Sequence, residues 1–494
     1  MYYPSIDEVK KLSRKYNRIP VYKEMNISEP GMLMLLKTLQ NDRNVIFLES
    51  AKLDKTAGRF SYLGFNPSRV VRFMSIDNEP FVFIENENSS THVQETIFDF
   101  LKKEVAEYSS PEYKQFGSYN GGYTGYFGFD TINYTGILRS KVKEDANLPL
   151  ASFALIDDFI CLDNKINKHF LATVIYTDDS KNIEDQYNEA LKVLQKNESD
   201  IIRKISQTTI PYMPSFAKEL PLKFRENKDE FAEKVKKIKQ LIHDGEAIQV
   251  VLSMRAEIEN KIDPYIFFLK LRDLNPSPYM YFLKLNDLRI VGSSPEIHVK
   301  IDRSQIHLKP IAGTILQGST REENRRHKEI LLNDPKERAE HLMLVDLGRN
   351  DLGRVSKPGT VKVSHFMQPE DYSHVIHLVT DVKGTLRSDK NMIDVIKETF
   401  PAGTISGAPK VRAIEIIDEC ETIARGIYSG AIGYIGFNGY ADTCITIRTA
   451  YFTPDGDYLQ AGAGIVMDSV PEKEYEEIRN KLKALAVSLP FAEV

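Results

Sequence analysis

Four glutamates in two pairs are the residues of this 494-residue chain whose spacing most directly indicates chemistry. Glu337 and Glu340 stand three residues apart in DPKERAEHLMLVDLGRND, and Glu474 and Glu477 repeat that spacing in PEKEYEEIRNKLKALAV. On a helix, residues three apart share one face, so two such helices could close on one hard divalent cation. Mg²⁺ takes one or two carboxylates directly and keeps waters, which suits one inner and one outer glutamate per helix. A single pair of this kind is more often a solvated helix surface.

Turns built from small residues lie in the same half of the chain. Residues 309–314 (KPIAGT), 401–410 (PAGTISGAPK) and 460–466 (QAGAGIV) each bend the backbone at glycine and offer amide N–H donors. A helix beginning after Ser406 and Gly407 would also aim the positive end of its dipole toward an anion. Each turn alone is more often an ordinary tight turn, but together with the glutamate pairs they favour a ligand site.

Arg448 and His377 are the remaining candidates for chemistry. Arg448 interrupts an otherwise apolar strand pattern, TCITIRTAYF. A buried arginine needs an anionic partner, and its fork geometry suits a carboxylate. His377 follows His374 by three residues, so alternation on a strand puts the two on opposite faces and at most one faces a site. A satisfied core histidine is the alternative for His377.

Several common catalytic motifs are missing from the sequence. It contains no Walker A motif, no G-x-G-x-x-G after a strand, no G-x-S-x-G and no H-E-x-x-H. Nucleotide-dependent and serine-dependent chemistry therefore have no support. By elimination, the residues favour a small anionic substrate held by Mg²⁺, backbone amides and an arginine.

Composition and charge describe an ordinary globular chain. Its formal net charge of −5 gives no general attraction to nucleic acid or to a membrane surface. It has no apolar run of about 18 residues or more, and its first residues lack the pattern of a signal peptide. Cys161, Cys420 and Cys444 show no C-x-x-C spacing. This predicts a cytoplasmic protein without a disulfide framework or a cysteine-rich zinc site.

The strand and helix patterns predict an α+β fold with large antiparallel sheets flanked by helices, because too many strand patterns are adjacent for a regular βαβ repeat. Three prolines and a loss of periodicity between residues 197 and 222 predict a linker. We therefore expect an N-terminal region over residues 1–210 and a catalytic domain over residues 224–494. The pattern G-x-x-G-Y-x-G-F occurs at 122–129 and again at 430–437, which indicates related sheet motifs in both halves.

Seven motifs occur in one order between residues 310 and 477: PIAGT, EHLMLVDLGRND, HLVT, AGTISGAPK, IYSGAIGYIG, ITIRTA and AGAGIV. Together they resemble the chorismate-utilising enzymes, and within that family the large subunits of anthranilate synthases. The resemblance covers nearly the whole chain. It implies the fold of those enzymes and the conversion of chorismate and ammonia to anthranilate and pyruvate, the first step of tryptophan biosynthesis.

Two positions separate the branches of that family. Its members that add water carry a lysine base where this chain has Gln249, and aminodeoxychorismate synthases commonly carry a nucleophilic lysine where it has Ala312. Formation of isochorismate or of aminodeoxychorismate is therefore disfavoured, and ammonia is the expected nucleophile. A non-catalytic ligand sensor on the same fold is a further alternative, disfavoured because Glu296, His377 and the four glutamates are all present.

The resemblance implies a metal site and a reaction path. Mg²⁺ would be bound directly by Glu340 and Glu477, with Glu337 and Glu474 in the water-mediated shell, and would hold the ring carboxylate of chorismate. The implied catalytic residues are Glu296, His377 and Thr404. The implied substrate contacts are Gly313, Thr314, Tyr428, Arg448, Gly462, Gly464 and Lys481.

Glu296 and His377 would serve different steps of the implied reaction. Glu296 would protonate the departing C4 hydroxyl, which requires a raised pKa. Ammonia would add at C2 to give aminodeoxyisochorismate. His377 would then take the C2 proton as pyruvate leaves and the ring becomes aromatic.

The stretches FLES and NPSPYMYF resemble a tryptophan feedback site, to which the region 1–210 would contribute. The residues implied for it are Glu49, Ser50, Pro276, Tyr279, Met280 and Cys444, with Arg59 assisting. A structural turn before a strand is the alternative for PSPYM. None of the three cysteines lies in the tight elbow that a glutamine amidotransferase needs. We therefore expect this chain to use free ammonia alone, and glutamine only with a separate amidotransferase subunit.

Overall fold

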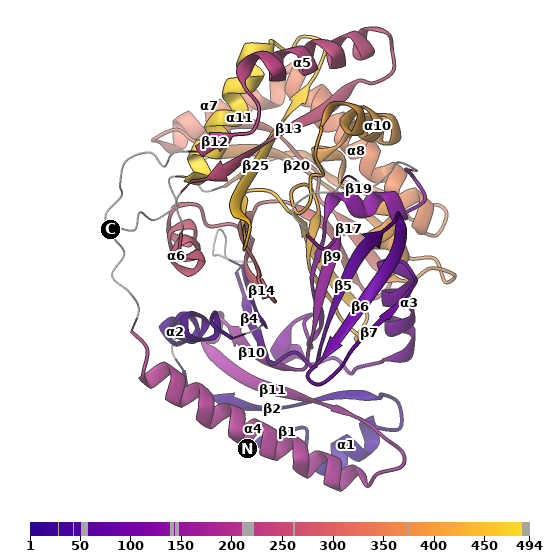
Figure 1. Cartoon of the computed structure of the whole chain (residues 1–494), viewed down its shortest axis with the longest axis vertical. Coiled ribbons are helices and arrows are strands. Elements are labelled where there is room, and N and C mark those ends of the chain that lie inside the picture. The colour runs from indigo at the N-terminus through magenta and orange to yellow at the C-terminus, as the bar shows by residue number, and fades with distance from the viewer. Residues whose placement is uncertain are drawn as a thin grey trace.

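The computed structural model describes residues 1–27, 29–42, 44–50, 58–138, 143, 148–209, 222–259, 262–372 and 375–486. Two large antiparallel sheets stand against each other, and helices cover their outer faces (Figure 1). Aromatic and aliphatic side chains of both sheets fill the space between them, including Tyr62 and Phe159 from one sheet and Tyr126 and Tyr434 from the other. The predicted α+β fold with large antiparallel sheets is confirmed.

The first sheet has 13 strands and runs through both halves of the chain. In spatial order its strands are β1 (Tyr2–Tyr3), β2 (Arg18–Met25), β11 (Lys168–Tyr176), β10 (Asp158–Asp163), β4 (Phe60–Phe65), β3 (Asn44–Glu49), β14 (Tyr279–Leu285), β15 (Leu288–Ser294), β24 (Thr449–Thr453), β25 (Gly456–Ile465), β13 (Gln249–Ile258) and β12 (Leu222–Phe224), with β21 (Gly407–Ala408) also pairing with β13.

The second sheet has 12 strands and is shared in the same way. Its order is β18 (Ile311–Leu316), β20 (Val375–Thr385), β17 (Gln305–Leu308), β16 (Ile297–Asp302), β23 (Tyr440–Ile445), β22 (Ala431–Ile435), β8 (Gly122–Phe127), β9 (Ala151–Ile156), β5 (Arg69–Ile76), β6 (Glu79–Asn86) and β7 (Ser90–Val93), with β19 (Lys362–Asp371) also pairing with β20.

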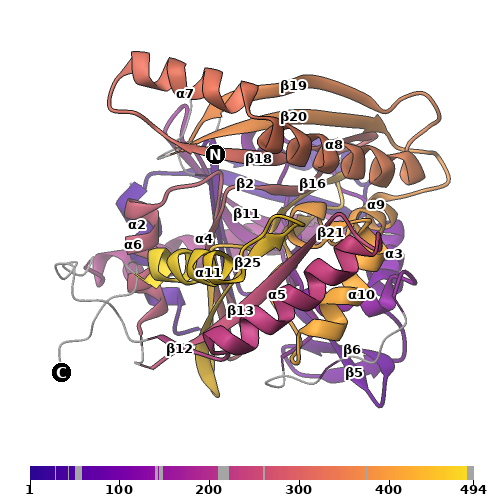
Figure 2. The same ribbon diagram turned by 90° about the horizontal axis from the view of Figure 1, so that it is seen from above.

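Helices lie along the outer faces of both sheets; in the view from above, α5 and α11 cross beside β13 and β25, while α7 and α8 follow β18 to β20 (Figure 2). The helices are α1 (Ile6–Leu12), α2 (Glu29–Leu39), α3 (Ile97–Glu107), α4 (Ile183–Ser206), α5 (Lys228–His243), α6 (Pro264–Leu274), α7 (Arg321–Asn333), α8 (Pro335–Val355), α9 (Met392–Thr399), α10 (Lys410–Cys420) and α11 (Pro471–Ala486), with the 3₁₀ turns η1 (Lys114–Phe116), η2 (Phe129–Tyr134) and η3 (Gly403–Ile405). Among the described residues, no helix is both long enough and apolar enough to cross a membrane.

The two halves repeat one topology. Outward from the junction of the first sheet, the order is β3, β4, β10, β11, β2, β1 on one side and β14, β15, β24, β25, β13, β12 on the other. Outward from the junction of the second sheet, β8, β9, β5 and β6 correspond to β22, β23, β16 and β17. The expectation of related sheet motifs in both halves is therefore confirmed.

The repeated glycine pattern lies at the junction of the second sheet. Gly125 of β8 stands opposite Gly433 of β22. A Cβ at Gly125 would lie 2.0 Å from the carbonyl oxygen of Ser152, and one at Gly433 would lie 2.1 Å from that of Asp442. Each glycine is required because the neighbouring strand approaches too closely for a side chain.

Both glutamate pairs lie on helices, as predicted. Helix α8 begins with Pro335 after the N-cap Asp334, whose side chain accepts hydrogen bonds from the backbone N–H groups of Lys336 and Glu337. Proline at the first helical position and aspartate at the N-cap both favour a helix start. Glu337 therefore lies in the first turn of α8, and Glu474 lies in the first turn of α11.

Two boundaries differ from expectation. Helix α4 continues to Ser206, so the predicted linker is shorter at its start, and residues 210–221 lie outside the described residues. The helix expected directly after Ser406 and Gly407 begins only at Lys410. Gly407 is taken instead by the short strand β21, whose pairing with β13 satisfies the backbone there. The small-residue turn therefore does not lead directly into a helix.

Candidate active site

Glu296 lies in the turn between β15 and β16 and is 5% exposed. Its Oε1 accepts a hydrogen bond of 2.7 Å from Thr404 Oγ1 on η3, and the backbone N–H of Ile311 also donates to the carboxyl group. Burial raises the pKa of Glu296 to about 8, although both hydrogen bonds and the charge of Arg448 act in the opposite direction. The side chain is therefore protonated at neutral pH and can donate a proton.

His377 lies on β20, and its Nδ1 is 2.9 Å from the carbonyl oxygen of Gly313 and 3.1 Å from Thr314 Oγ1. Because a carbonyl oxygen only accepts, Nδ1 carries the hydrogen and Nε2 keeps a lone pair. Burial lowers the pKa of His377 below its ordinary value, and the nearby charge of Arg448 lowers it further. The imidazole is thus a neutral base at pH 7. His374 lies outside the described residues.

The turn from Ala312 to Thr314 connects His377 to the first glutamate pair. Gly313 has a φ of 70°, and the register of β18 against β20 shifts between Ala312 and Thr314. The backbone N–H of Thr314 donates to the carboxylate of Glu337. A Cβ at Gly313 would lie 3.2 Å from Glu337 Oε2, so the carboxylate rests against the bare backbone of the turn.

The four glutamates influence one another across the two helices. Burial raises the pKa values of Glu337, Glu340 and Glu474. Like charge adds to this effect: Glu340 is affected by both Glu337 and Glu477, and Glu474 by Glu477. The described residues contain no three acidic, histidine or cysteine side chains already gathered as a metal cage. The two helices therefore bring the carboxylates near one another, but not close enough together to form a complete set of metal ligands.

Lys481 lies between the second glutamate pair and the glycine strand. Its Nζ is 2.8 Å from Glu477 Oε1 and donates a 2.9 Å hydrogen bond to the carbonyl oxygen of Gly462 on β25. Tyr428 covers the same strand, since a Cβ at Gly462 would lie 2.8 Å from its hydroxyl. Gln249 covers the neighbouring position, because a Cβ at Gly464 would lie 2.2 Å from its Nε2. The glycines are thus enclosed by polar side chains.

Arg448 follows β23 in the turn to β24 and has a φ of 52°. Burial lowers the pKa of its guanidinium, and the charge of Glu296 opposes that shift. Its side chain makes no hydrogen bond or ion pair with any residue that the structure describes. Arg448 is partly buried, and a partly desolvated charge without a protein partner suits an anionic ligand. The left-handed backbone conformation of a non-glycine residue fits a functional position.

The residues predicted for tryptophan gather where β3 meets β14 and near β23. Glu49 stands opposite Met280 in the sheet, Tyr279 donates its hydroxyl hydrogen to Asp442 at 2.9 Å, and Cys444 is buried on β23. Pro276 precedes β14, and Ser50 Oγ accepts a 3.0 Å hydrogen bond from the backbone N–H of Gly58. Tyr279 and Cys444 lie in the core between the sheets, whereas Met280 packs in the other core cluster and Glu49 bonds to α6. The six residues are therefore neighbours, but they do not all share one face of the first sheet.

Two residues near this cluster have partners that the sequence does not indicate. Glu49 forms two hydrogen bonds of 2.8 Å with Arg272 on α6. Arg59, expected to assist, forms an ion pair with Asp163 at 2.8 Å. Neither pairing has a local sequence signal, because the partners lie 223 and 104 residues away.

Because the topology is repeated, the first half contains a position that corresponds to the active site. Side chains of the first half occupy that position. Ser68 directly precedes β5 as Glu296 precedes β16, and Asp157 lies in the turn after β9 as Arg448 lies in the turn after β23. Arg18, which is fully buried, donates to Asp157 and to the carbonyl oxygens of Asn120 and Ile156, each at 2.8 Å. An internal ion pair therefore closes the counterpart in the first half.

Comparison with known proteins gives one consistent result. The family model for chorismate binding enzymes matches residues 46–487. Proteins named anthranilate synthase component 1 from Acetivibrio thermocellus and from Aquifex aeolicus are each 41% identical to this chain, covering 100% and 99% of it and 99% and 98% of themselves. A crystal structure of anthranilate synthase component I from Streptococcus pneumoniae has a TM-score of 0.74 at 33% identity and covers 88% of this chain and 94% of its own. The menaquinone-specific isochorismate synthase from Escherichia coli, at 17% identity and a TM-score of 0.67, shares the fold.

Proposed function

The chain belongs to the chorismate binding enzymes and groups with the anthranilate synthase component 1 proteins among them, and we propose that it converts chorismate and ammonia to anthranilate and pyruvate with Mg²⁺. One observation carries the proposal. A buried acid, Glu296, which accepts a hydrogen bond from Thr404, and a buried base, His377, which is held by Gly313, have pKa values shifted in opposite directions, and the charge of Arg448 acts on both. Acid and base groups separated in this way are the arrangement that two successive proton transfers need.

In the first step, Glu296 donates its proton to the C4 hydroxyl of chorismate, which leaves as water. The nitrogen of ammonia bonds to C2 as the ring double bonds shift, and the product is aminodeoxyisochorismate. The hydrogen bond from Thr404 fixes the position of the carboxyl group. After transfer, the carboxylate is stabilised by Thr404 and by the nearby positive charge of Arg448.

In the second step, Nε2 of His377 takes the proton from C2. The C3–oxygen bond of the enolpyruvyl ether then breaks, pyruvate leaves and the ring becomes aromatic. The Nδ1–H bond to Gly313 holds the ring in the orientation that exposes Nε2. Arg448 and Tyr428, with the backbone around Gly462 and Gly464, bind the enolpyruvyl carboxylate during both steps.

The glutamates fit magnesium by the chemistry of their donor atoms. Carboxylate oxygens are the ligands that Mg²⁺ prefers, and the mutual repulsion of Glu340 and Glu477 is relieved by a cation between them. Lys481 provides one positive charge there already, through its ion pair with Glu477. Glu340 and Glu477 would hold the metal directly, with Glu337 and Glu474 through water. When bound, Mg²⁺ supplies the positive charge that holds the ring carboxylate beside the carbon that is attacked.

Two residues favour ammonia over other nucleophiles. Gln249 lies against Gly464 and Ala312 lies on β18 beside the strand of His377, so neither position supplies a lysine.

The three cysteines are buried and unpaired, and burial raises the thiol pKa of each. A buried thiol of raised pKa is a poor nucleophile for hydrolysing glutamine. Ammonia would come from a separate glutamine amidotransferase subunit, and tryptophan would bind as inhibitor at the cluster around Glu49.

A fluorescence assay for anthranilate tests this proposal. Purified protein with chorismate, Mg²⁺ and an ammonium salt should form anthranilate, and replacing the ammonium salt by glutamine should abolish product formation. Product chromatography separates the neighbouring activities. Accumulation of isochorismate or aminodeoxychorismate in place of anthranilate, or no consumption of chorismate, would refute the proposal.

A further inference from the structure

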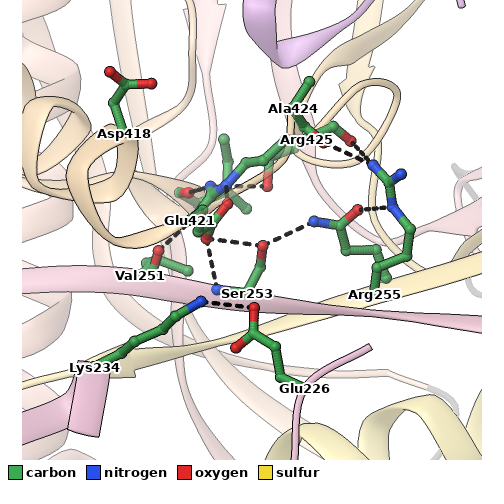
Figure 3. Close-up of polar contacts among 12 residues, drawn as sticks. Glu226, Lys234, Val251, Ser253, Arg255, Asp418, Glu421, Ala424 and Arg425 are labelled. Atoms are coloured by element: carbon green, nitrogen blue, oxygen red, sulfur yellow. Dashed lines mark hydrogen bonds and ion pairs between the residues drawn. The ribbon is translucent and has the colours of Figure 1, made fainter. Parts of the chain in front are cut away.

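Arg425 is a buried arginine outside the proposed catalytic residues, in the loop that follows α10 (Figure 3). Its side chain is 1% exposed, and all five of its N–H groups have partners. Nε and Nη2 donate to the two oxygens of Glu421 at 2.9 and 2.7 Å. The remaining hydrogens go to the carbonyl oxygens of Ile405 at 2.8 Å and Val251 at 2.6 Å, and to Ser429 Oγ at 3.4 Å.

These partners are the immediate neighbours of active-site residues. Ile405 follows Thr404, which donates to Glu296. Ser429 follows Tyr428, whose hydroxyl lies over Gly462. One guanidinium therefore holds the Thr404 turn and the Tyr428 turn at the same time.

Glu421 extends this connection to the glycine strand. Its Oε1 accepts hydrogen bonds from the backbone N–H of Ser253 at 2.8 Å and from Ser253 Oγ at 2.9 Å (Figure 3). Ser253 stands opposite Gly462 in the pairing of β13 with β25, and its hydroxyl also accepts a 2.9 Å hydrogen bond from Gln460 Nε2. The carboxylate thus fixes the strand on which the substrate-facing glycines lie.

The first half of the chain supports the same loop. The ring of Phe129 lies 4.6 Å from the guanidinium carbon of Arg425, a distance at which a cation and an aromatic face attract each other. Asp130 accepts a 2.7 Å hydrogen bond from the backbone N–H of Gly426. Arg425 is therefore restrained on every side, as a group that sets the geometry of its neighbours must be.

We propose that Arg425 and Glu421 form a positioning pair for the reaction. The pair fixes the positions of Thr404, Tyr428 and the strand of Gly462 relative to one another and does not touch the substrate. The inference rests on the proposed function. Stability alone does not explain the pair, because a buried ion pair is often no more stabilising than well-packed apolar residues. Lysine could replace the charge of Arg425, but its single ammonium cannot reach Glu421, Ile405 and Val251 in the planar arrangement of a guanidinium.

The test compares Arg425→Lys with Arg18→Lys. Arg18 is the matched control because it is equally buried and bonds a carboxylate and two backbone carbonyls in the closed counterpart of the site. We expect Arg425→Lys to lower kcat by about 10- to 100-fold in the folded protein, since small displacements of reacting groups have effects of that size. Arg18→Lys should lower the melting temperature and leave kcat within about twofold.

The pH profile of kcat/KM shows whether Arg425 acts on Glu296 through Thr404. The hydrogen bond from Thr404 holds the pKa of Glu296 down, so its loss should move the alkaline limb of kcat/KM to higher pH. Arg425→Lys and Thr404→Ala should both cause this shift, and the double variant should lose little more activity than Thr404→Ala alone. A purely structural arginine would leave the limb in place and give additive losses.

Hydrogen exchange of the peptide spanning Phe400–Lys410 provides a readout that needs no activity. Exchange there should be faster in Arg425→Lys than in the wild type and unchanged in Arg18→Lys. If the wild type forms no anthranilate, the proposed function fails while this comparison still decides the positioning role. Glu421→Gln, which keeps the shape of the side chain, provides the same readouts if Arg425→Lys does not fold. The proposal would be overturned if the folded variants had the same kcat, the same alkaline limb of kcat/KM and the same hydrogen exchange as the wild type.

Discussion

Replacing Glu296 by glutamine should strongly lower activity and should stabilise the folded protein at alkaline pH. Burial raises the pKa of this side chain from 4.5 to about 8. At about 1.36 kcal/mol per pKa unit, the protein disfavours the ionised form by about 5 kcal/mol. The residue is 5% exposed, so solvent screens little of this cost. Glutamine keeps the shape of the protonated acid and does not titrate.

The direction of the pH dependence follows from proton binding. Between pH 4.5 and about 8 the folded protein keeps a proton that the unfolded chain has released. The folded state binds more protons over that range, so the wild-type free energy of unfolding falls as pH rises through it. Glu296→Gln should therefore match the wild type near pH 5 and exceed it by up to about 5 kcal/mol near pH 8.

Thermal unfolding near both pH values measures this difference. With an unfolding entropy of about 2.1 cal/mol/K per residue, about 5 kcal/mol corresponds to a melting temperature higher by about 5 °C in a chain of this length. Anthranilate formation should fall by about 10²- to 10⁴-fold, the usual contribution of a general acid. An equal melting-temperature difference at both pH values, or a variant that keeps its turnover, would refute the assignment of Glu296 as a neutral buried acid.

Three further substitutions test other parts of the site. His377→Ala should block aromatisation more than amination, so chromatography should show aminodeoxyisochorismate accumulating; equal loss of intermediate and anthranilate would count against the second-step base. Glu340→Gln should raise the Mg²⁺ concentration for half-maximal activity by about tenfold or more in a metal titration, and an unchanged titration would remove Glu340 from the metal site. Ser50→Ala should weaken inhibition by tryptophan in a dose–response assay, and a wild-type enzyme indifferent to tryptophan would eliminate the feedback site.

Local periodicity was sufficient to place many site residues on their elements. The glutamate pairs required only the helical repeat and the capping residues at Asp334 and Pro335, both readable in the sequence. The repeated glycine pattern indicated paired sheets because close strand approach imposes glycine at fixed positions such as Gly125 and Gly433. These are short-range constraints, so they leave a signal in a short stretch of chain.

Helix α7 was not predicted from the sequence. Residues 321–333 are mostly charged and lack a strong apolar stripe, and their one buried side chain is Leu331. The reciprocal hydrogen bonds of Thr320 and Glu323 cap its start, and that capping box was the signal available for finding it.

Partners of buried charges could not be predicted, because they are set by tertiary packing. The sequence around Glu49 does not indicate that Arg272 is its partner. The sequence around Arg425 does not indicate a hydrogen bond to the carbonyl group of Val251, which is 174 residues away. Arg425 does stand four residues after Glu421, the spacing of a helical ion pair. That spacing indicates the pair but not the three segments of the site that it joins.

We propose that this chain aminates chorismate and then releases pyruvate from the same ring. The most direct test is the stoichiometry of pyruvate and anthranilate formed from a known amount of chorismate with Mg²⁺ and an ammonium salt. One pyruvate for each anthranilate, at the expense of one chorismate, is the predicted result. Consumption of chorismate without release of pyruvate, or release of pyruvate without anthranilate, would contradict it.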